Sequence, residues 1–292
     1  MESVQYHAPQ SLEDAVPLLK EARTTPSRIL AGGTDLLIQM RAGVKTPEML
    51  IDIKKIPELT QLEMGADQIR LGAAVPSAVM DENAELHQQL PGVVEGMELI
   101  GSTQVQGRAT PGGNLCNASP AGDGAPAMIV SSGQCVIFGP NGTRTIPVEE
   151  VCTAPGRTSL ADDELLQEFI FPAPKPGQSD AYLRFIPRNE MDIAVVGVAA
   201  NITVDASGTC TAAKVALGAI APTVVIATDI AALLVGTKLD DDTLAAAAEM
   251  ASGLGSPISD KRGTTEFRHR IAGVLTRRVI KIAAARAGER LQ

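Results

Sequence analysis

The chain has 292 residues, a length that predicts two domains or one domain with a clear subdivision. Its formal net charge of −9 and a pI near 4.9 argue against binding nucleic acid or an anionic membrane through bulk electrostatics. The sequence contains no stretch of about 18 uncharged apolar residues and no basic segment followed by an apolar core near residue 1. We therefore expect a soluble, cytoplasmic protein without membrane insertion.

The four cysteines, Cys116, Cys135, Cys152 and Cys210, are widely spaced, and the three histidines lie far from them. Neither a CxxC motif nor a Cys/His cluster is present, so the spacing predicts no metal or iron–sulfur site in this chain. In a cytoplasmic protein such isolated thiols are expected to be reduced and structural.

The pattern of apolar residues and turn formers over residues 1–171 predicts a series of short helices and strands. A first helix is expected over 11–22, with Ser11 as N-cap, Asp14 in the capping-box position and a kink at Pro17. A strand over 27–30 follows. Further helices are expected over 34–41, 84–100 and 124–131, further strands over 49–53, 59–64, 68–73 and 165–171, and a hairpin over 134–147 that turns at 139–142.

Residues 172–179 read PAPKPGQS, a composition typical of a linker, and we expect a domain boundary there. Beyond it, strands over 193–204 and 211–217 flank a turn at 205–208, and a short strand is expected over 224–227. Helices are expected over 239–251 and 265–288. The last helix carries a basic face, for which a solvated surface is the simpler interpretation and a docking surface the alternative.

Two glycine turns lie far apart, AGGTD at 31–35 and TPGGN at 110–114, and each follows an apolar stretch. Because glycine has no Cβ, the N–H groups of such turns can approach a phosphate, and nearby Thr, Asn and Asp side chains add hydrogen-bonding groups. A lone glycine pair is more often only a turn, but two such turns and the polar stretch after the second indicate paired diphosphate cradles. No GxGxxG opens a helix, and neither GxxxxGK[ST] nor GxSxG occurs, so Rossmann, P-loop and α/β-hydrolase sites are not predicted.

Six motifs occur in an order that identifies a family: AGGTDLL at 31–37, QV at 104–105, TPGGNLCNASPAGD at 110–123, RFIPRNEMDIAVVGVAA at 184–200, ALGAIAP at 216–222 and SDKRGTTEFRHRIAGVLTRR at 259–278. With them the chain resembles, over nearly its whole length, the FAD-binding medium subunit of the molybdenum hydroxylases, which include xanthine dehydrogenase and aerobic carbon monoxide dehydrogenase. The family usually reads QVRNxGTIGGN, so Gln106, Gly107, Ala109 and Pro111 depart from its pattern. Pro111 has no N–H to offer a phosphate.

The resemblance implies an α+β fold with two domains. Residues 1–175 would form a two-subdomain FAD-binding domain of the vanillyl alcohol oxidase-like type, with subdomains of about 1–55 and 56–175. Residues 176–292 would form a small α+β C-terminal domain, a three-stranded sheet with helices.

The resemblance also assigns cofactor-binding residues and no catalytic residue. Contacts to the FAD diphosphate and ribityl chain are expected from Leu30, Ala31, Gly32, Gly33, Thr34, Asp35, Leu36, Leu37, Thr110, Gly112, Gly113 and Asn114. Ile100 would pack near the isoalloxazine, Asp123 would bond a polar part of the cofactor, Leu166 would lie by the adenine or the ring system, and Arg184 would replace a family lysine near the flavin.

Three of the residues in these motifs have a second interpretation. Asp35 is equally well explained as the N-cap of the helix that starts at Leu36. Cys116 is better explained as a packing residue than as a redox thiol. Asp192 is better explained as the start of a core strand than as a flavin contact.

The function implied by the resemblance is electron transfer. A large molybdopterin subunit would hydroxylate the substrate, a small subunit with two 2Fe–2S clusters would carry electrons, and FAD here would pass them to an external acceptor, either NAD, a quinone, a cytochrome or oxygen. A dimer of heterotrimers is expected, and the motifs lean toward a purine, aldehyde or N-heterocycle as substrate. A cofactor-free assembly subunit and a stand-alone flavin oxidase are the alternatives.

Overall fold

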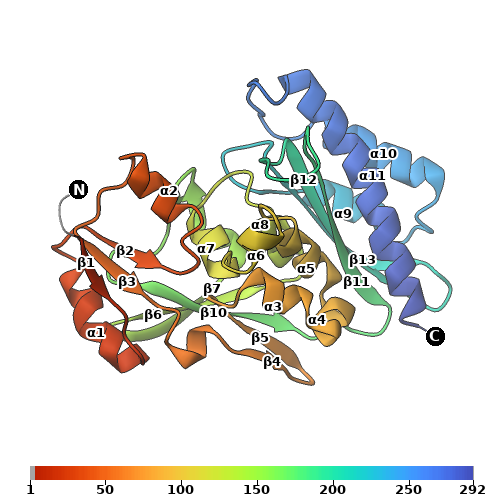
Figure 1. Cartoon of the computed structure of the whole chain (residues 1–292). Coiled ribbons are helices and arrows are strands. Elements are labelled where there is room, and N and C mark those ends of the chain that lie inside the picture. The colour runs from red at the N-terminus through yellow and green to blue at the C-terminus, as the bar shows by residue number, and fades with distance from the viewer. Residues whose placement is uncertain (1–3, 292) are drawn as a thin grey trace.

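The computed structural model describes residues 4–291, so residues 1–3 and 292 of the predicted domain ranges lie outside the described part. The chain forms a small parallel sheet, then a five-stranded sheet with a group of short helices inserted between its strands, and then a four-stranded sheet with long helices (Figure 1). None of the helices within 4–291 combines the length and apolar character that a membrane span requires.

The parallel sheet has the order β1-β3-β2, with β1 at Gln5–His7, β2 at Ser27–Leu30 and β3 at Met49–Asp52. All four residues of the central strand β3 are buried, as expected for a parallel strand covered on both faces. Helix α1, Leu12–Glu21, begins as predicted, because the Ser11 side chain accepts the Asp14 N–H at 3.0 Å. Helix α2, Leu36–Arg41, is short and has no buried residue.

The second sheet is antiparallel with the order β4-β5-β10-β6-β7. Its strands are β4 at Leu62–Met64, β5 at Gln68–Gly72, β6 at Gln134–Gly139, β7 at Gly142–Pro147 and β10 at Leu165–Pro172. The predicted hairpin at 139–142 is confirmed, since Gly139 pairs with Gly142. The register of central strand β10 shifts between Leu166 and Glu168, and this bulge sends the Gln167 carbonyl to the Ala73 N–H at 2.9 Å. Short elements complete this part: η1 at Pro57–Leu59, η2 at Val148–Glu150, β8 at Cys152–Ala154 and β9 at Arg157–Thr158.

Six short helices lie in the chain between β5 and β6: α3 at Ser77–Asp81, α4 at Ala84–Gln89, α5 at Pro91–Glu98, α6 at Thr103–Gln106, α7 at Pro111–Cys116 and α8 at Gly124–Val130. Buried residues of α3, α4, α5, α7 and α8 share one apolar cluster with β5, β6 and β10. The prediction of one helix over 84–100 is wrong. Leu90 leaves the helical region, with φ −131° and ψ 59°, because a residue before proline is disfavoured there, and Pro91 starts the new helix α5. The second glycine segment is likewise not an open turn but helix α7, with Thr110 as N-cap and Pro111 in its first turn.

The last sheet is antiparallel in the order β11-β12-β13-β14, with β11 at Gln178–Phe185, β12 at Val196–Val204, β13 at Cys210–Gly218 and β14 at Val225–Ile226. Strands β12, β13 and β14 lie where strands were expected over 193–204, 211–217 and 224–227, whereas β11 was not predicted from the sequence pattern. Helices α5 and α8 contact these strands from one side, while α11, Thr265–Glu289, crosses the other side with α10, Asp241–Ser252, beside it (Figure 1). Helix α9, Thr228–Leu234, packs against β13.

The segment between Pro172 and Gln178 contains no helix or strand, and we propose that the boundary between the two domains lies there. One large apolar cluster is centred on β5, β6, β10, α5 and α8 and extends across the boundary to Tyr182, Ala199 and Ala216. The other is centred on β12, β13 and α11. A third, smaller cluster lies under α1 and β3.

Candidate functional site

The two glycine segments, which are separated by more than 70 residues, meet in space. The Arg108 Nε–H donates to the Gly32 carbonyl at 3.4 Å, and a Cβ placed on Gly32 would overlap the Arg108 carbonyl oxygen. A Cβ placed on Gly113 would lie 3.9 Å from that of Ala31. Gly32 is therefore required by the close approach of the second segment to the first.

The first segment exposes a row of backbone donors. Within residues 4–291, no acceptor is found for the N–H groups of the five successive residues from Gly32 to Leu36. Gly33 has φ +78°, a left-handed conformation that glycine adopts without strain. Successive unpaired N–H groups that curve through a glycine into the start of a helix form an anion-binding concavity.

The second segment uses its own donors internally, which corrects the expectation of two equivalent cradles. The Gly112 N–H donates to the Ala73 carbonyl at 2.9 Å, the Gly113 N–H to Thr110 Oγ1 at 3.1 Å, and the Asn114 N–H to the Thr110 carbonyl at 2.9 Å. A Cβ on Gly112 would lie 2.6 Å from both the Cβ and the carbonyl oxygen of Ala73, so this glycine serves packing. The second segment can thus offer side chains to a ligand, but not the N–H groups of these glycines.

Two cations that the sequence analysis missed lie at the first segment. Lys54 Nζ donates to the Ala31 carbonyl at 2.9 Å and to Asp52 Oδ1 at 2.7 Å, and Arg108 reaches the next carbonyl, that of Gly32. Tyr6 holds the other oxygen of Asp52 at 2.6 Å. The strand register, in which Leu30 pairs with Asp52, brings Lys54 to the glycine turn, and nothing in the local sequence around Lys54 signals this.

Asp123 and Arg184 lie at the other end of the site and contact each other. Arg184 Nη1 donates to Asp123 Oδ2 at 2.7 Å, and the Tyr182 hydroxyl donates to Asp123 Oδ1 at 2.7 Å. Burial raises the pKa of Asp123 to about 6, although Arg184 and Tyr182 oppose that rise. The Arg184 side chain is 4% exposed, and its buried Nε–H has no acceptor within residues 4–291. That unpaired N–H is a donor still available to a bound group.

Asn114 links the two ends of the site. Its side-chain oxygen accepts the Gly124 N–H at 3.2 Å, directly beside Asp123. A second link joins α2 to the end of α7, where Gln39 Nε2 donates to Asn117 Oδ1 at 3.3 Å. Hydrogen bonds therefore connect α2 to the end of α7, and α7 to the start of α8 beside Asp123.

The predicted apolar site residues occupy supporting positions. Leu30 is buried, and its Cδ1, like that of Leu37, would touch a Cβ on Gly33. Leu36 is partly exposed and Leu37 is 46% exposed on α2. Leu166 is buried at the bulge of β10, in the same cluster as Leu115 of α7, and Ile100 packs against that cluster just after α5. Leu166 thus supports the second segment from the core.

The residues with a second interpretation are placed as follows. Asp35 occupies the N-cap position of α2, as the first interpretation expected, but its side chain makes no capping hydrogen bond. Burial raises the pKa of the Cys116 thiol to about 12, and all four cysteines are free, which agrees with structural thiols. Asp192 precedes β12 and pairs with Arg188 at 3.4 Å and Arg262 at 3.1 Å, so it does not begin the core strand.

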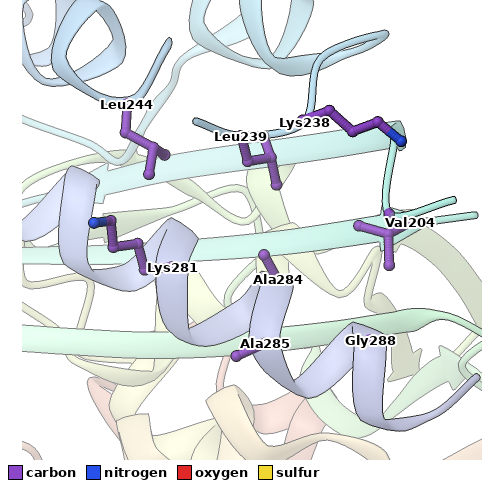
Figure 2. Close-up of a pocket in the computed structure, with 9 residues that line it drawn as sticks. Val204, Lys238, Leu239, Leu244, Lys281, Ala284, Ala285 and Gly288 are labelled. Atoms are coloured by element: carbon purple, nitrogen blue, oxygen red, sulfur yellow. The ribbon is translucent and has the colours of Figure 1, made fainter. Parts of the chain in front are cut away.

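A separate hollow of about 290 Å³ lies between α11 and the loop before α10 (Figure 2). Val204, Leu239, Leu244 and Ala284 line it, and none of the predicted site residues does. Both of its lysines form hydrogen bonds. Lys238 Nζ donates to Ser207 Oγ, and Lys281 Nζ donates to Asp241 Oδ1 at 2.8 Å. It is therefore a small apolar depression distinct from the glycine segments.

Known proteins are similar to this chain over nearly its whole length. Residues 2–174 match the family model "FAD binding domain in molybdopterin dehydrogenase", and residues 181–283 match "CO dehydrogenase flavoprotein C-terminal domain". The chain is 32% identical to the xanthine dehydrogenase FAD-binding subunit of Escherichia coli and 32% identical to the carbon monoxide dehydrogenase medium chain of Afipia carboxidovorans, over 98% of each chain. The structure of reconstituted carbon monoxide dehydrogenase from Oligotropha carboxidovorans superposes with a TM-score of 0.92 at 31% identity, covering 97% of this chain and 98% of that one.

The chain is an FAD-binding flavoprotein of the oxidoreductase class. It belongs to the family of FAD-binding subunits of the molybdopterin dehydrogenases, the molybdenum hydroxylases of the resemblance drawn from the sequence. The residues present fit this cofactor, because the row of unpaired N–H groups with two adjacent cations suits a diphosphate and the buried Arg184 Nε–H suits a polar edge of a ring.

Proposed function

We propose that this chain is the electron-transfer subunit of a molybdenum hydroxylase complex. Its FAD would accept electrons from the 2Fe–2S clusters of a small subunit and deliver them to an external acceptor, while a large molybdopterin subunit oxidises the substrate. The observation that carries the proposal is the row of five unpaired backbone donors beside Lys54 and Arg108, within a domain of the FAD-binding family.

Different residues of the site would bind different parts of FAD. The N–H groups of 32–36 would hold the diphosphate, with Lys54 and Arg108 balancing its charge. Thr110 and Asn114 would add side-chain hydrogen bonds, and Arg184, held by Asp123, would face the flavin. FAD, when bound, supplies a carrier that takes electrons singly and releases them in pairs. No acid or base for substrate chemistry is required of this chain.

A purine or another N-heterocycle is the proposed substrate class of the large subunit. Support comes from relatives named for xanthine, nicotinate, nicotine and caffeine, which are 32%, 30%, 30% and 29% identical to this chain. Carbon monoxide dehydrogenase medium chains are equally similar, so assay of the complete complex with carbon monoxide and with N-heterocycles is the experiment that separates the two classes.

Purification of the chain with its partners tests the whole proposal. We expect about one FAD released per chain on denaturation, co-purification of a molybdopterin polypeptide and a 2Fe–2S polypeptide, and bleaching of the flavin band when substrate is added without acceptor. A complex without flavin would instead support the assembly-subunit alternative. Substrate turnover by the isolated chain would support the oxidase alternative.

A further inference from the structure

Three side chains with metal-ligating atoms converge outside the flavin site. Asp81 ends α3, His87 lies in α4 and Glu98 ends α5, and one ligand atom from each lies within 4.8 Å of the others. His87 Nε2 is 2.8 Å from the Asp81 carbonyl oxygen and 3.2 Å from Asp81 Oδ1. The spacing in the sequence did not predict this cluster, because the break at Pro91 turns α5 back beside α3.

The two carboxylates of the cluster lack the partners that such groups usually have. Within residues 4–291, neither Asp81 nor Glu98 forms an ion pair with a lysine or an arginine, and the His87 imidazole lies beside the Asp81 carboxylate. The Glu98 carboxylate lies close to that of Asp81, and the Glu98 backbone carbonyl accepts a hydrogen bond from Gln106. Elsewhere on α5, by contrast, Glu95 pairs with Arg286 at 2.5 Å.

The donor set selects a class of ion. One imidazole nitrogen and two carboxylate oxygens suit Zn²⁺ and its neighbours in the first transition row, whereas Mg²⁺ and Ca²⁺ prefer oxygen alone. His87 Nε2 donates to the Asp81 carbonyl oxygen at 2.8 Å, so an ion bound at Nε2 would take the place of this hydrogen and leave Nδ1 as the protonated nitrogen. His87 and Asp81 are both partly exposed, so water can complete the coordination.

We propose that Asp81, His87 and Glu98 form a binding site for a first-row divalent transition-metal ion, with Zn²⁺ as the preferred member. The ion would fasten α3, α4 and α5 together and relieve the proximity of the two carboxylates. Since it would bind the folded state and not the unfolded chain, it acts as a structural clip that raises thermal stability. Helix α5 leads directly to Ile100, so the clip would hold the helix that supports the flavin side of the domain.

Calorimetric titration of chelator-treated, full-length protein with Zn²⁺, in excess Mg²⁺, tests the site. We expect one Zn²⁺ per chain and a higher melting temperature with Zn²⁺ than without it. In His87→Gln and Glu98→Gln the affinity should fall at least about tenfold, and the melting temperature should no longer respond to Zn²⁺. Because each variant is compared with and without metal, a change in its own stability does not obscure the result.

Glu85→Gln is the matched control. Glu85 lies on the same helix α4 as His87 but bonds only Gln89, at 3.3 Å, so this variant should bind Zn²⁺ like the unaltered chain. The proposal is overturned if the unaltered chain binds no stoichiometric Zn²⁺. It is equally overturned if His87→Gln and Glu98→Gln bind the ion as tightly as Glu85→Gln.

Discussion

Arg184 of β11 reaches across the domain boundary to Asp123, which precedes α8, and their charged atoms lie 2.7 Å apart with both side chains less than a tenth exposed. A buried carboxylate held by a single guanidinium and one tyrosine hydroxyl depends strongly on those partners. The pair therefore fastens β11 to the segment before α8, across the proposed domain boundary.

Replacing Arg184 by Met should destabilise the apoprotein by about 3 kcal/mol at pH 8, because Asp123 is left buried without a counter-charge. The pKa of Asp123, already raised to about 6 in the folded chain, should rise further. The folded state then favours protonation, so the loss should be smaller at pH 5 than at pH 8. Urea unfolding at both pH values measures this, and the double variant Asp123→Asn/Arg184→Met should recover part of the stability. Equal losses at both pH values would contradict it.

Asp180 gives a pH-dependence of predictable sign. Burial raises its pKa to about 6 from an ordinary value of 3.8, and its Oδ1 has no partner within residues 4–291. Because the folded pKa is the higher one, the stability contributed by Asp180 is full below pH 4 and is lost as pH rises through 6. Asp180→Asn should therefore gain stability relative to the unaltered chain between pH 4 and pH 7, by up to about 3 kcal/mol.

Asp205→Asn is the control of opposite sign for this experiment. Hydrogen bonds from Ser207 and Thr209 hold the pKa of exposed Asp205 below its usual value, so its contribution is present above pH 4 and lost as pH falls. Asp205→Asn should thus lose stability relative to the unaltered chain as pH rises from 3 to 5. Chemical unfolding across this range compares the two variants.

Lys54→Met and Arg108→Gln should each weaken FAD binding by about tenfold, because each removes a cation next to the unpaired donors of the first glycine segment. Fluorescence titration of the apoprotein with FAD measures the dissociation constant. Lys55→Met is the matched control, since Lys55 is adjacent but exposed. Unchanged affinity in both variants would contradict the assignment of the diphosphate to this segment.

Arg286→Ala should loosen the contact between the domains. Arg286 donates to Glu95 of α5 at 2.5 Å and to the Asp180 carbonyl at 3.1 Å, so it connects α11 both to the other domain and to β11. We expect faster limited proteolysis within 172–178 in this variant. Arg277→Ala, which loses only a bond to Asp241 within the second domain, should be cleaved like the unaltered chain.

Local signals in the sequence predicted much of the fold. Ser11 as N-cap, the hairpin at 139–142 and the turn at 205–208 depend on neighbouring residues, and all three are present. The break before Pro91 also has a local cause, although it was not predicted. Helix α7 was missed because paired glycines favour turns, and Thr110 with Pro111 overrides that preference here.

The candidate site was predicted less completely, because its contacts are distant in sequence. The two glycine segments were found, but Lys54 depends on the pairing of β2 with β3, and Gly32 is required by Arg108, 76 residues away. Gly112 was assigned to the ligand, whereas its N–H belongs to Ala73. Strand register and domain packing decide such roles, and neither is visible in a local pattern.

The contact between Glu95 and Arg286 spans 191 residues, so the ribosome must add nearly two-thirds of the chain after Glu95 before the bond can form. Strands β11, β12 and β13, which cover α5 and α8, end at Gly218, so the sheet is synthesised before Arg286. The bond from Arg286 to Glu95 therefore locks an arrangement of α5 against the sheet that can already exist during translation.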